Sequence, residues 1–184
     1  MTISRCKWCQ GDELMMKYHD EEWGVECHDD NYLFELLILE GAQAGLSWKT
    51  VLHKRQNYRI AFDNFNATKI ANYTDEKINQ LMQNSGIIRN KLKIISTIKN
   101  AQAFLKIQNQ FGSFDKYIWQ FINHKPIKNI VESMMHLPTT TIQAQNMSKN
   151  LLKNGFKFVG PTICYAFMQG CGMVIDHEKT CFKA

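Results

Sequence analysis

The sequence predicts a compact all-α protein, and three observations favour this fold class. Apolar residues recur at helical spacing in several segments, side chains that commonly cap helices precede those segments, and strand-like patterns are scarce. The chain has 184 residues, 45% of them hydrophobic, which is enough to bury one core. No internal repeat, low-complexity tract or obvious linker interrupts it, so we expect a single domain over residues 1–184.

Two helices are expected early in the chain. Asp29 and Asp30 can cap a helix over residues 32–40. Because this helix is apolar nearly all round, we expect it to lie buried at the centre of the protein. Ser47 can cap the next helix, which is predicted to carry the basic run at residues 53–55.

Five further helices are expected over residues 74–85, 91–110, 113–122, 141–153 and 161–169. The helix over 91–110 is the clearest of these, because apolar side chains follow a helical period along it. Pro126 and Pro138 indicate an irregular link between two helices. Basic residues within 81–93 indicate either a surface that contacts a DNA backbone or simply a solvated face.

Composition sets only broad limits on function. A formal charge of +5 and a pI near 8.8 suit a polyanionic partner such as DNA, although many ordinary enzymes share them. No apolar run is long enough to span a bilayer, so we expect no membrane partner. Six cysteines without a signal peptide do not indicate a disulfide framework, and we expect a reduced, cytoplasmic protein.

Candidate metal ligands stand at both ends of the chain. Cys6 and His19 lie near its start, while His177 and Cys181 lie four residues apart near its end. Two cysteines and two histidines form a closed tetrahedral set, which suits structural zinc better than a catalytic metal. The spacing alone leaves two alternatives open, namely a competing pair of Cys6 with Cys9 and buried thiols that bind no metal.

A glycine-rich turn at residues 155–162 joins two of the expected helices. Gly155 suits the left-handed position that ends a helix, and Gly160 followed by Pro161 suits a tight turn into the next one. The segment resembles the helix-hairpin-helix element of DNA repair proteins, in which backbone N–H groups hold a DNA phosphate. The alternative is an ordinary helical connection capped by glycine.

Several distinctive blocks follow one another along the chain. They are CKW, YHDEEWGV, LEGAQAGLSW, AF with a downstream F, GIIR, WQF, FKFVG and DH, at residues 6–8, 18–25, 39–48, 61–65, 86–89, 119–121, 156–160 and 176–177. Together they resemble the signatures of the 3-methyladenine DNA glycosylase I family over essentially the whole chain. Tryptophan-containing blocks in a fixed order are far more specific than any single motif.

The resemblance implies an α-helical fold of the helix-hairpin-helix glycosylase superfamily, with a zinc clasp joining the N- and C-terminal segments. The zinc ligands it implies are Cys6, His19, His177 and Cys181. The cysteines at positions 9, 27, 164 and 171 are then not ligands. Residues 1–28 and 170–184 would form a small terminal lobe held by the zinc.

The function implied by the resemblance is base-excision repair. Such a glycosylase flips 3-methyladenine out of double-stranded DNA and releases it by hydrolysis, without cleaving the strand. Methylation at N3 gives the base a positive charge and weakens its bond to the sugar, so no strong general acid is required. We expect a monomer whose partners are DNA that contains 3-methyladenine and the free base as product.

A pocket for a flat cationic ring needs aromatic faces and a carboxylate. The resemblance places Glu40, Tyr18 and Trp48 at the base-binding positions, with Glu40 as the catalytic residue. Trp8 and Trp23 are expected to form further walls. The two methionines before Tyr18, at positions 15 and 16, stand where relatives can place another aromatic side chain, so one wall is expected to be softer.

Contacts with DNA are assigned to three residues. Leu46 could fill the gap left by the extruded base, and Gly160 with Lys157 could contact the backbone. Asp176 is not included as a catalytic acid, because it follows Gly160 too closely and the family works without that aspartate. We expect it instead to orient a zinc-bound histidine. Trp119 is expected in the core.

Two other functions stay open at this point. The first is a non-enzymatic, zinc-stapled helical module that binds a DNA backbone, which leaves Glu40, Tyr18 and Trp48 without a purpose. The second is a glycosylase of broader specificity for alkylated or oxidised bases, which spacing alone does not distinguish.

Overall fold

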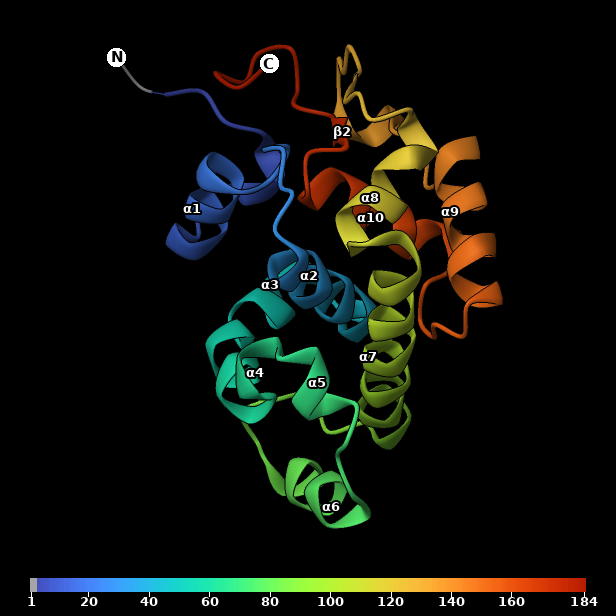
Figure 1. The fold of residues 1–184 in the computed structure, drawn as a ribbon. Helices are drawn as coiled ribbons and strands as arrows, with labels where there is room; N and C mark the ends of the chain where they lie inside the picture. Colours follow the sequence, from blue (N-terminus) through green and yellow to red (C-terminus); the bar gives the residue numbers. More distant parts are fainter. Residues whose placement is uncertain (1–2) are drawn as a thin grey trace.

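A computed structural model describes residues 3–184, and the predicted all-α fold is confirmed (Figure 1). The α-helices of this region are α1 (Glu13–Glu21), α2 (Asp30–Gln43), α3 (Trp48–Leu52), α4 (Arg55–Ala61), α5 (Ala67–Ile70), α6 (Asp75–Gln83), α7 (Lys91–Phe111), α8 (Phe114–Trp119), α9 (Ile142–Lys153) and α10 (Pro161–Gly170). Its shorter elements are the 3-10 helices η1 (Lys7–Cys9), η2 (Asp63–Phe65), η3 (Gln120–Ile122) and η4 (Met134–His136), and the strands β1 (Ile127–Lys128) and β2 (Val174–Ile175).

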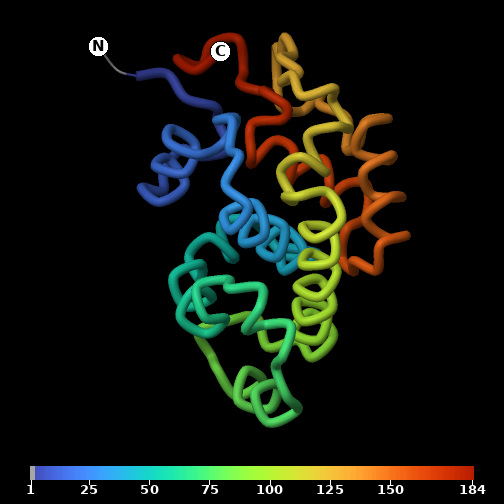
Figure 2. Tube along the Cα trace, in the orientation of Figure 1, coloured from blue at the N-terminus to red at the C-terminus, as the bar shows by residue number. Residues whose placement is uncertain are grey.

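Helix α2 lies at the centre of the fold, as its apolar sequence predicts (Figure 2). Every residue from 33 to 42 is buried, and the helix contacts α3, α7, α8 and α10. Asp29 caps it by accepting a hydrogen bond from the backbone N–H of Tyr32. Trp119, expected in the core, is also fully buried there.

Side-chain caps begin several of the expected helices, among them the one predicted at Ser47. Ser47, Ser113 and Thr141 each accept a hydrogen bond from a backbone N–H in the first turn of α3, α8 and α9. Pro161 occupies the first position of α10, where its missing N–H leaves no gap in the hydrogen bonding.

The basic run at residues 53–55 does not form one exposed helical face. The chain breaks after α3, and Arg55 begins α4 with its guanidinium buried between two carboxylates. Arg55 pairs with Glu22 at 2.7 Å and with Glu35, which also pairs with Arg59 at 2.8 Å. This network fastens α4 to α2, so Arg55 belongs to the core, whereas His53 in the same run stays exposed.

The link punctuated by Pro126 and Pro138 is more ordered than predicted. Its β1 lies parallel to β2, with Ile127 opposite Val174 and Lys128 opposite Ile175. Two-residue strands have no detectable period in a sequence, and their partner here lies far along the chain, so only the tertiary fold reveals them.

The two ends of the chain lie side by side (Figure 1). Backbone N–H groups of Gly24 and Cys27 donate to the carbonyls of Gln169 and Cys171 at 2.9 and 3.1 Å, and Phe182 donates to Ser4 at 2.9 Å. Ligand-bearing segments from both ends therefore meet at one place. The single-domain division and the separate terminal lobe stay predictions. Over residues 3–184, no helix has the length and apolar character to cross a bilayer.

A glycine makes this meeting of the two ends possible. Gly172 has φ +74°, and a Cβ at its position would lie 2.3 Å from the carbonyl carbon of Val25. Gly11 has a similar φ of +80°, but a Cβ there would meet no atom within 4 Å. Alanine substitutions at Gly172 and Gly11 therefore distinguish the cost of backbone strain, which both share, from the cost of steric overlap, which only Gly172 has.

We predict that Gly172→Ala lowers the free energy of unfolding by about 3 kcal/mol or more, because strain and overpacking add. Gly11→Ala should lose only about 1 kcal/mol from its left-handed backbone. Urea unfolding of both variants measures the difference. Equal losses would contradict the close approach of Gly172 to the N-terminal segment.

Candidate functional site

A cavity of about 440 Å³ opens where the N-terminal segment faces α2, α3 and α10. All five predicted base-binding residues line it, namely Trp8, Tyr18, Trp23, Glu40 and Trp48. The sequence did not indicate its remaining walls, among them Gln43, Lys49, Met134, Ala166 and Gln169. Met15 also lies there, in agreement with the softer wall that was predicted.

Aromatic rings form two sides of this cavity. The rings of Tyr18 and Trp48 lie 5.1 Å apart with 47° between their planes. Trp8 meets Trp23 at 5.1 Å and Tyr18 at 6.4 Å, edge to face in both cases. Rings arranged in this way present both faces and edges to a flat ligand.

Glu40 is buried on the last turns of α2 and faces the cavity. Its side chain is only 5% exposed, although a lone glutamate near a helix end is usually solvated. Burial raises the pKa of Glu40 to about 8. Within residues 3–184 no hydrogen bond to its carboxyl group contributes to its pKa, and burial is the only cause of the shift. The cavity therefore contains an acceptor that is neutral near pH 7 and ionises when a cation approaches.

Buried hydrogen-bond donors also belong to residues that line the cavity. The indole N–H groups of Trp8 and Trp48 are buried and find no acceptor within residues 3–184. Burial, with the nearby Glu40 charge, raises the pKa of the Tyr18 hydroxyl well above its usual value, so this group stays protonated. Buried donors without a partner are costly in a folded protein.

The absence of a side chain at Gly170 leaves room for the Tyr18 hydroxyl. A Cβ on Gly170 would lie 2.9 Å from the Tyr18 oxygen and 3.0 Å from a Leu36 methyl group. Glycine at the end of an apolar helix is typical of an ordinary helix terminator, so this role has no signal in the sequence.

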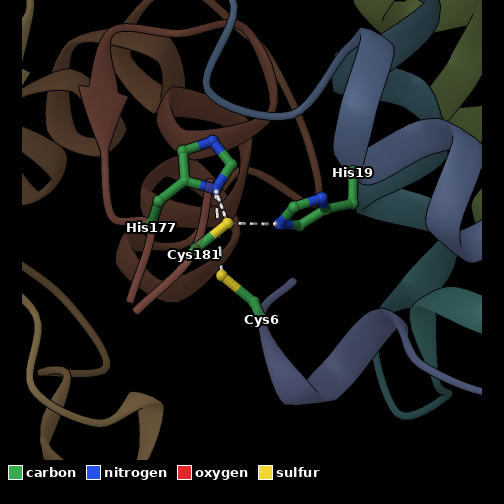
Figure 3. A group of neighbouring side chains, drawn as sticks. All are labelled: Cys6, His19, His177 and Cys181. Carbon is green, nitrogen blue, oxygen red and sulfur yellow. Dashed lines mark hydrogen bonds between the residues drawn. The ribbon is translucent and has the colours of Figure 1, made fainter. Parts of the chain in front are cut away.

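The four predicted metal ligands converge beside the cavity (Figure 3). All four are buried, and their ligand atoms lie within 4.8 Å of one another. Cys181 Sγ lies 3.4 Å from His19 Nε2 and 3.7 Å from His177 Nδ1, and Cys6 Sγ lies 3.8 Å from His177 Nδ1. Within residues 3–184 the other cysteines stand outside this Cys/His cluster, which could hold one metal ion.

Burial governs the charge of the cluster. It raises the pKa of the Cys6 thiol to about 12 and lowers the pKa of His177 to about 4. A neutral Cys6 thiol and neutral His19 and His177 imidazoles are therefore favoured without a metal. A metal cation bound here would displace thiol protons, so its affinity would rise with pH.

Asp20, and not Asp176, orients a ligand histidine. Asp20 lies 2.8 Å from Nδ1 of His19 and also pairs with Arg5 at 2.8 Å, which leaves Nε2 of His19 facing the cluster. The predicted role of Asp176 was wrong.

The Asp176 carboxylate instead accepts hydrogen bonds from Asn129, Tyr165 and Gln169, at 2.7, 2.6 and 2.7 Å. Being next to His177 in sequence misled the prediction, because adjacent residues near a strand point to opposite faces. Asp176 positions a wall of the cavity through Gln169.

Trp23 joins the Cys/His cluster to the cavity. Its ring stacks on His19 at 6.1 Å with 21° between planes, and meets His177 edge to face at 4.7 Å. Tyr18, the residue before His19 on α1, lies on the cavity side. The cluster and the aromatic walls therefore form one continuous layer.

The predicted DNA-contacting residues lie outside the cavity. Leu46 is 42% exposed on the turn between α2 and α3, and Lys157 is exposed on the loop before α10, which Gly160 caps. A smaller groove of about 170 Å³ runs from Glu40 past Leu46 to Thr162 at the start of α10. The structure thus connects the turn that carries Leu46 with the start of α10 through a groove that begins at Glu40.

Comparisons with known proteins agree with this site. Residues 8–184 match the family model described as methyladenine glycosylase. The chain is 46% identical over 179 residues to DNA-3-methyladenine glycosylase 1 of Escherichia coli, covering 97% of this chain and 96% of that protein.

Solved structures agree equally well. A crystal structure of 3-methyladenine DNA glycosylase I superposes with a TM-score of 0.95 at 47% identity, over 97% of this chain and 98% of that one. A Staphylococcus aureus structure concerned with 3-methyladenine recognition gives 0.94 at 35% identity, over 100% of this chain and 97% of that one. The chain belongs to the methyladenine glycosylase family, a class of hydrolases that cleave N-glycosidic bonds.

The raised pKa of Glu40 predicts a pH-dependent stability. Between its ordinary value of 4.5 and about 8, folded Glu40 keeps its proton while the unfolded chain has lost it. Its contribution to stability is therefore complete below 4.5 and is lost as pH rises through 8. The glutamine in Glu40→Gln does not titrate. The free energy of unfolding of this variant should therefore rise relative to that of wild type as the pH increases through this window. Urea unfolding of both proteins measures the gain, and a difference that stays constant with pH would contradict the buried position.

Proposed function

We propose that the protein removes 3-methyladenine from alkylated double-stranded DNA. It extrudes the damaged base, binds it in the 440 Å³ cavity and hydrolyses its bond to the sugar without cleaving the strand. The observation that carries this proposal is the unpaired, buried Glu40 among aromatic rings. Family membership agrees with it.

Recognition rests on the match between a cationic purine and this cavity. The faces of Tyr18 and Trp48 attract a positively charged ring. Glu40 accepts a hydrogen bond from an exchangeable N–H of the base, and ionises because the positive charge offsets the cost of its burial. Neutral, undamaged purines offer no such compensation, so they bind less well. Trp8 and Trp23 close the remaining sides.

Hydrolysis needs little chemical help from the protein. The methylated base departs neutral, so excision depends on extracting the base, holding it and admitting water to the sugar. Glu40 acts as the catalytic contact to the base. Lys49, at the rim of the cavity, is paired with Asp12 at 2.9 Å, which agrees with an enzyme that forms no Schiff base with the DNA.

The Cys/His cluster is proposed to hold one structural zinc ion. Zinc bonds of about 2.0–2.3 Å in a tetrahedron separate ligand atoms by about 3.4–3.8 Å. Three of the six separations, 3.4, 3.7 and 3.8 Å, fit this range, and all six lie within 4.8 Å. Two thiolates and two imidazoles complete its coordination, so the metal supplies no chemistry and instead fixes the walls that flank it.

Contacts with DNA are proposed on both sides of the smaller groove. The exposed Leu46 fills the space left by the extruded base, while Gly160 and Lys157 meet the phosphate backbone. A non-enzymatic DNA-binding module has no use for the Glu40 cavity, and family membership excludes it.

The test is incubation with methylated DNA, followed by chromatography of the released bases. The proposal expects 3-methyladenine and little 7-methylguanine. Release of both bases in proportion to their abundance would support a broader specificity, and release of neither would refute the proposed activity.

We predict that Glu40→Gln slows excision about tenfold or more, because the charged hydrogen bond is replaced by a neutral one. Affinity for the free base should fall, while affinity for undamaged DNA should stay near wild type. Trp48→Ala should also weaken base binding, and Trp48→Phe should keep most of it because stacking survives. An unchanged excision rate in Glu40→Gln would refute the assigned role.

We predict about one zinc ion per chain, because the cluster supplies one closed set of four ligands. Cys181→Ser should loosen the metal, and chelation should lower the melting temperature by roughly 5 °C or more. Metal analysis and thermal melting measure both effects. Cys164→Ser provides the control, since that thiol is buried far from the cluster's four ligands. Identical melting with and without metal would refute the structural role.

A further inference from the structure

We propose that one face of α7 aligns the two loops that contact DNA. Lys93 holds the turn between α2 and α3, and Asn100 holds the loop between α9 and α10. Both are positioning residues for base extraction and line no part of the base cavity. The inference rests on the proposed function, because that function gives the two loops their DNA contacts.

Lys93 is not a free basic residue on a solvated face. Its ammonium donates hydrogen bonds to the carbonyls of Ala42 and Ala44, each at 2.7 Å. These carbonyls end α2, where the helix dipole favours a positive charge. The sequence left open that Lys93 belongs to a solvated basic face. Its ammonium is instead hydrogen-bonded within the protein.

The carbonyls that Lys93 holds begin the turn that carries Leu46. This turn passes through Gly45, at φ +79°, and Ser47 then caps α3, which begins with the cavity residue Trp48. Helix α3 spans five residues, too few to hold a conformation alone. The turn therefore depends on contacts from outside it, and Lys93 supplies two of them.

Asn100 holds the second loop in a comparable way. Its buried amide donates to the carbonyl of Lys157 at 3.0 Å and accepts from the Lys157 N–H at 2.7 Å. The next residue, Phe158, has φ +55°, a conformation that a bulky side chain rarely adopts. Satisfying both backbone groups of Lys157 fixes this strained loop just before Gly160.

The two clamps, Lys93 for the first loop and Asn100 for the second, belong to the same helix, α7. Lys93 and Asn100 are seven residues apart, about two helical turns or 10 Å along α7. The second loop also packs against the last turn of α2, because a Cβ on Gly41 would lie 3.2 Å from Cβ of Phe158. Helix α7 therefore sets the distance between the residue that fills the duplex and the loop that meets the backbone.

The first experiment measures single-turnover release of 3-methyladenine by Lys93→Met. One duplex places the lesion opposite thymine and another opposite an abasic site, where extrusion costs less. Release from the paired duplex should slow roughly tenfold, and release from the abasic duplex should slow no more than about twofold to threefold. Affinity for the free base should stay within about twofold of wild type.

Three comparisons make the result specific. Lys91→Met removes the same charge from an exposed side chain two residues away and should release both substrates at wild-type rates. Lys93→Arg can still donate to both carbonyls and should recover most of the loss on the paired duplex. Equal slowing on both duplexes, or equal slowing by Lys91→Met, would overturn the inference. Absence of release by wild type would instead refute the proposed function.

Asn100→Ala tests the second clamp. It should weaken binding to undamaged duplex roughly threefold or more, because the loop loses its backbone contact geometry, and should leave free-base affinity within about twofold. Asn150→Ala is the control, since that amide donates only to the carbonyl of Asn146 in its own helix. Asn100→Ser, which keeps a small hydrogen-bonding group, serves if the alanine variant does not fold. Unchanged duplex affinity in the folded variant would overturn the role of Asn100.

Discussion

The base cavity exists only while the two ends of the chain are held together. Trp8, Tyr18 and Trp23 all come from the first 23 residues, whereas Glu40 and Trp48 belong to the central part of the fold. The N-terminal segment packs on the rest of the chain through a small apolar cluster that also includes Leu52 and Cys181 and is separate from the main core. Four buried ligands drawn from both ends, with the backbone bonds around Gly24 and Gly172, supply the attachment that the apolar contacts lack.

Two features near the cavity destabilise the free protein, and the proposed function gives a reason for the first of them. Glu40 is buried without a hydrogen-bonding partner within residues 3–184, and two indole N–H groups around it are unsatisfied. A protein selected only for stability would place apolar side chains at such positions. Under the proposed function, a cationic purine offers hydrogen-bond donors to the carboxylate. The same carboxylate therefore lowers stability in the empty state and provides selectivity in the bound state.

The sequence predicted the features that depend on local pattern and missed those that depend on distant contacts. The apolar helix around Leu37, the caps and the four ligands follow from residue type, spacing and family resemblance. Nothing local marks the break before Arg55, whose burial comes from carboxylates on two other segments. The role of Asp176 was misjudged because its partners lie on separate elements, and Gly170 reads as a helix terminator although it makes room for a tyrosine.

The dependence of the cavity on its terminal attachment is tested most directly by binding free 3-methyladenine with and without the metal. Calorimetric titration of the zinc-loaded and the chelated protein, at a temperature where circular dichroism shows both to be helical, gives the two affinities. The account predicts that removing the metal weakens binding roughly tenfold or more, because three of the five predicted base-binding residues lose their fixed positions, and that added zinc restores it. Equal affinities in the two forms would show that the aromatic walls stand without the cluster, and would contradict the account.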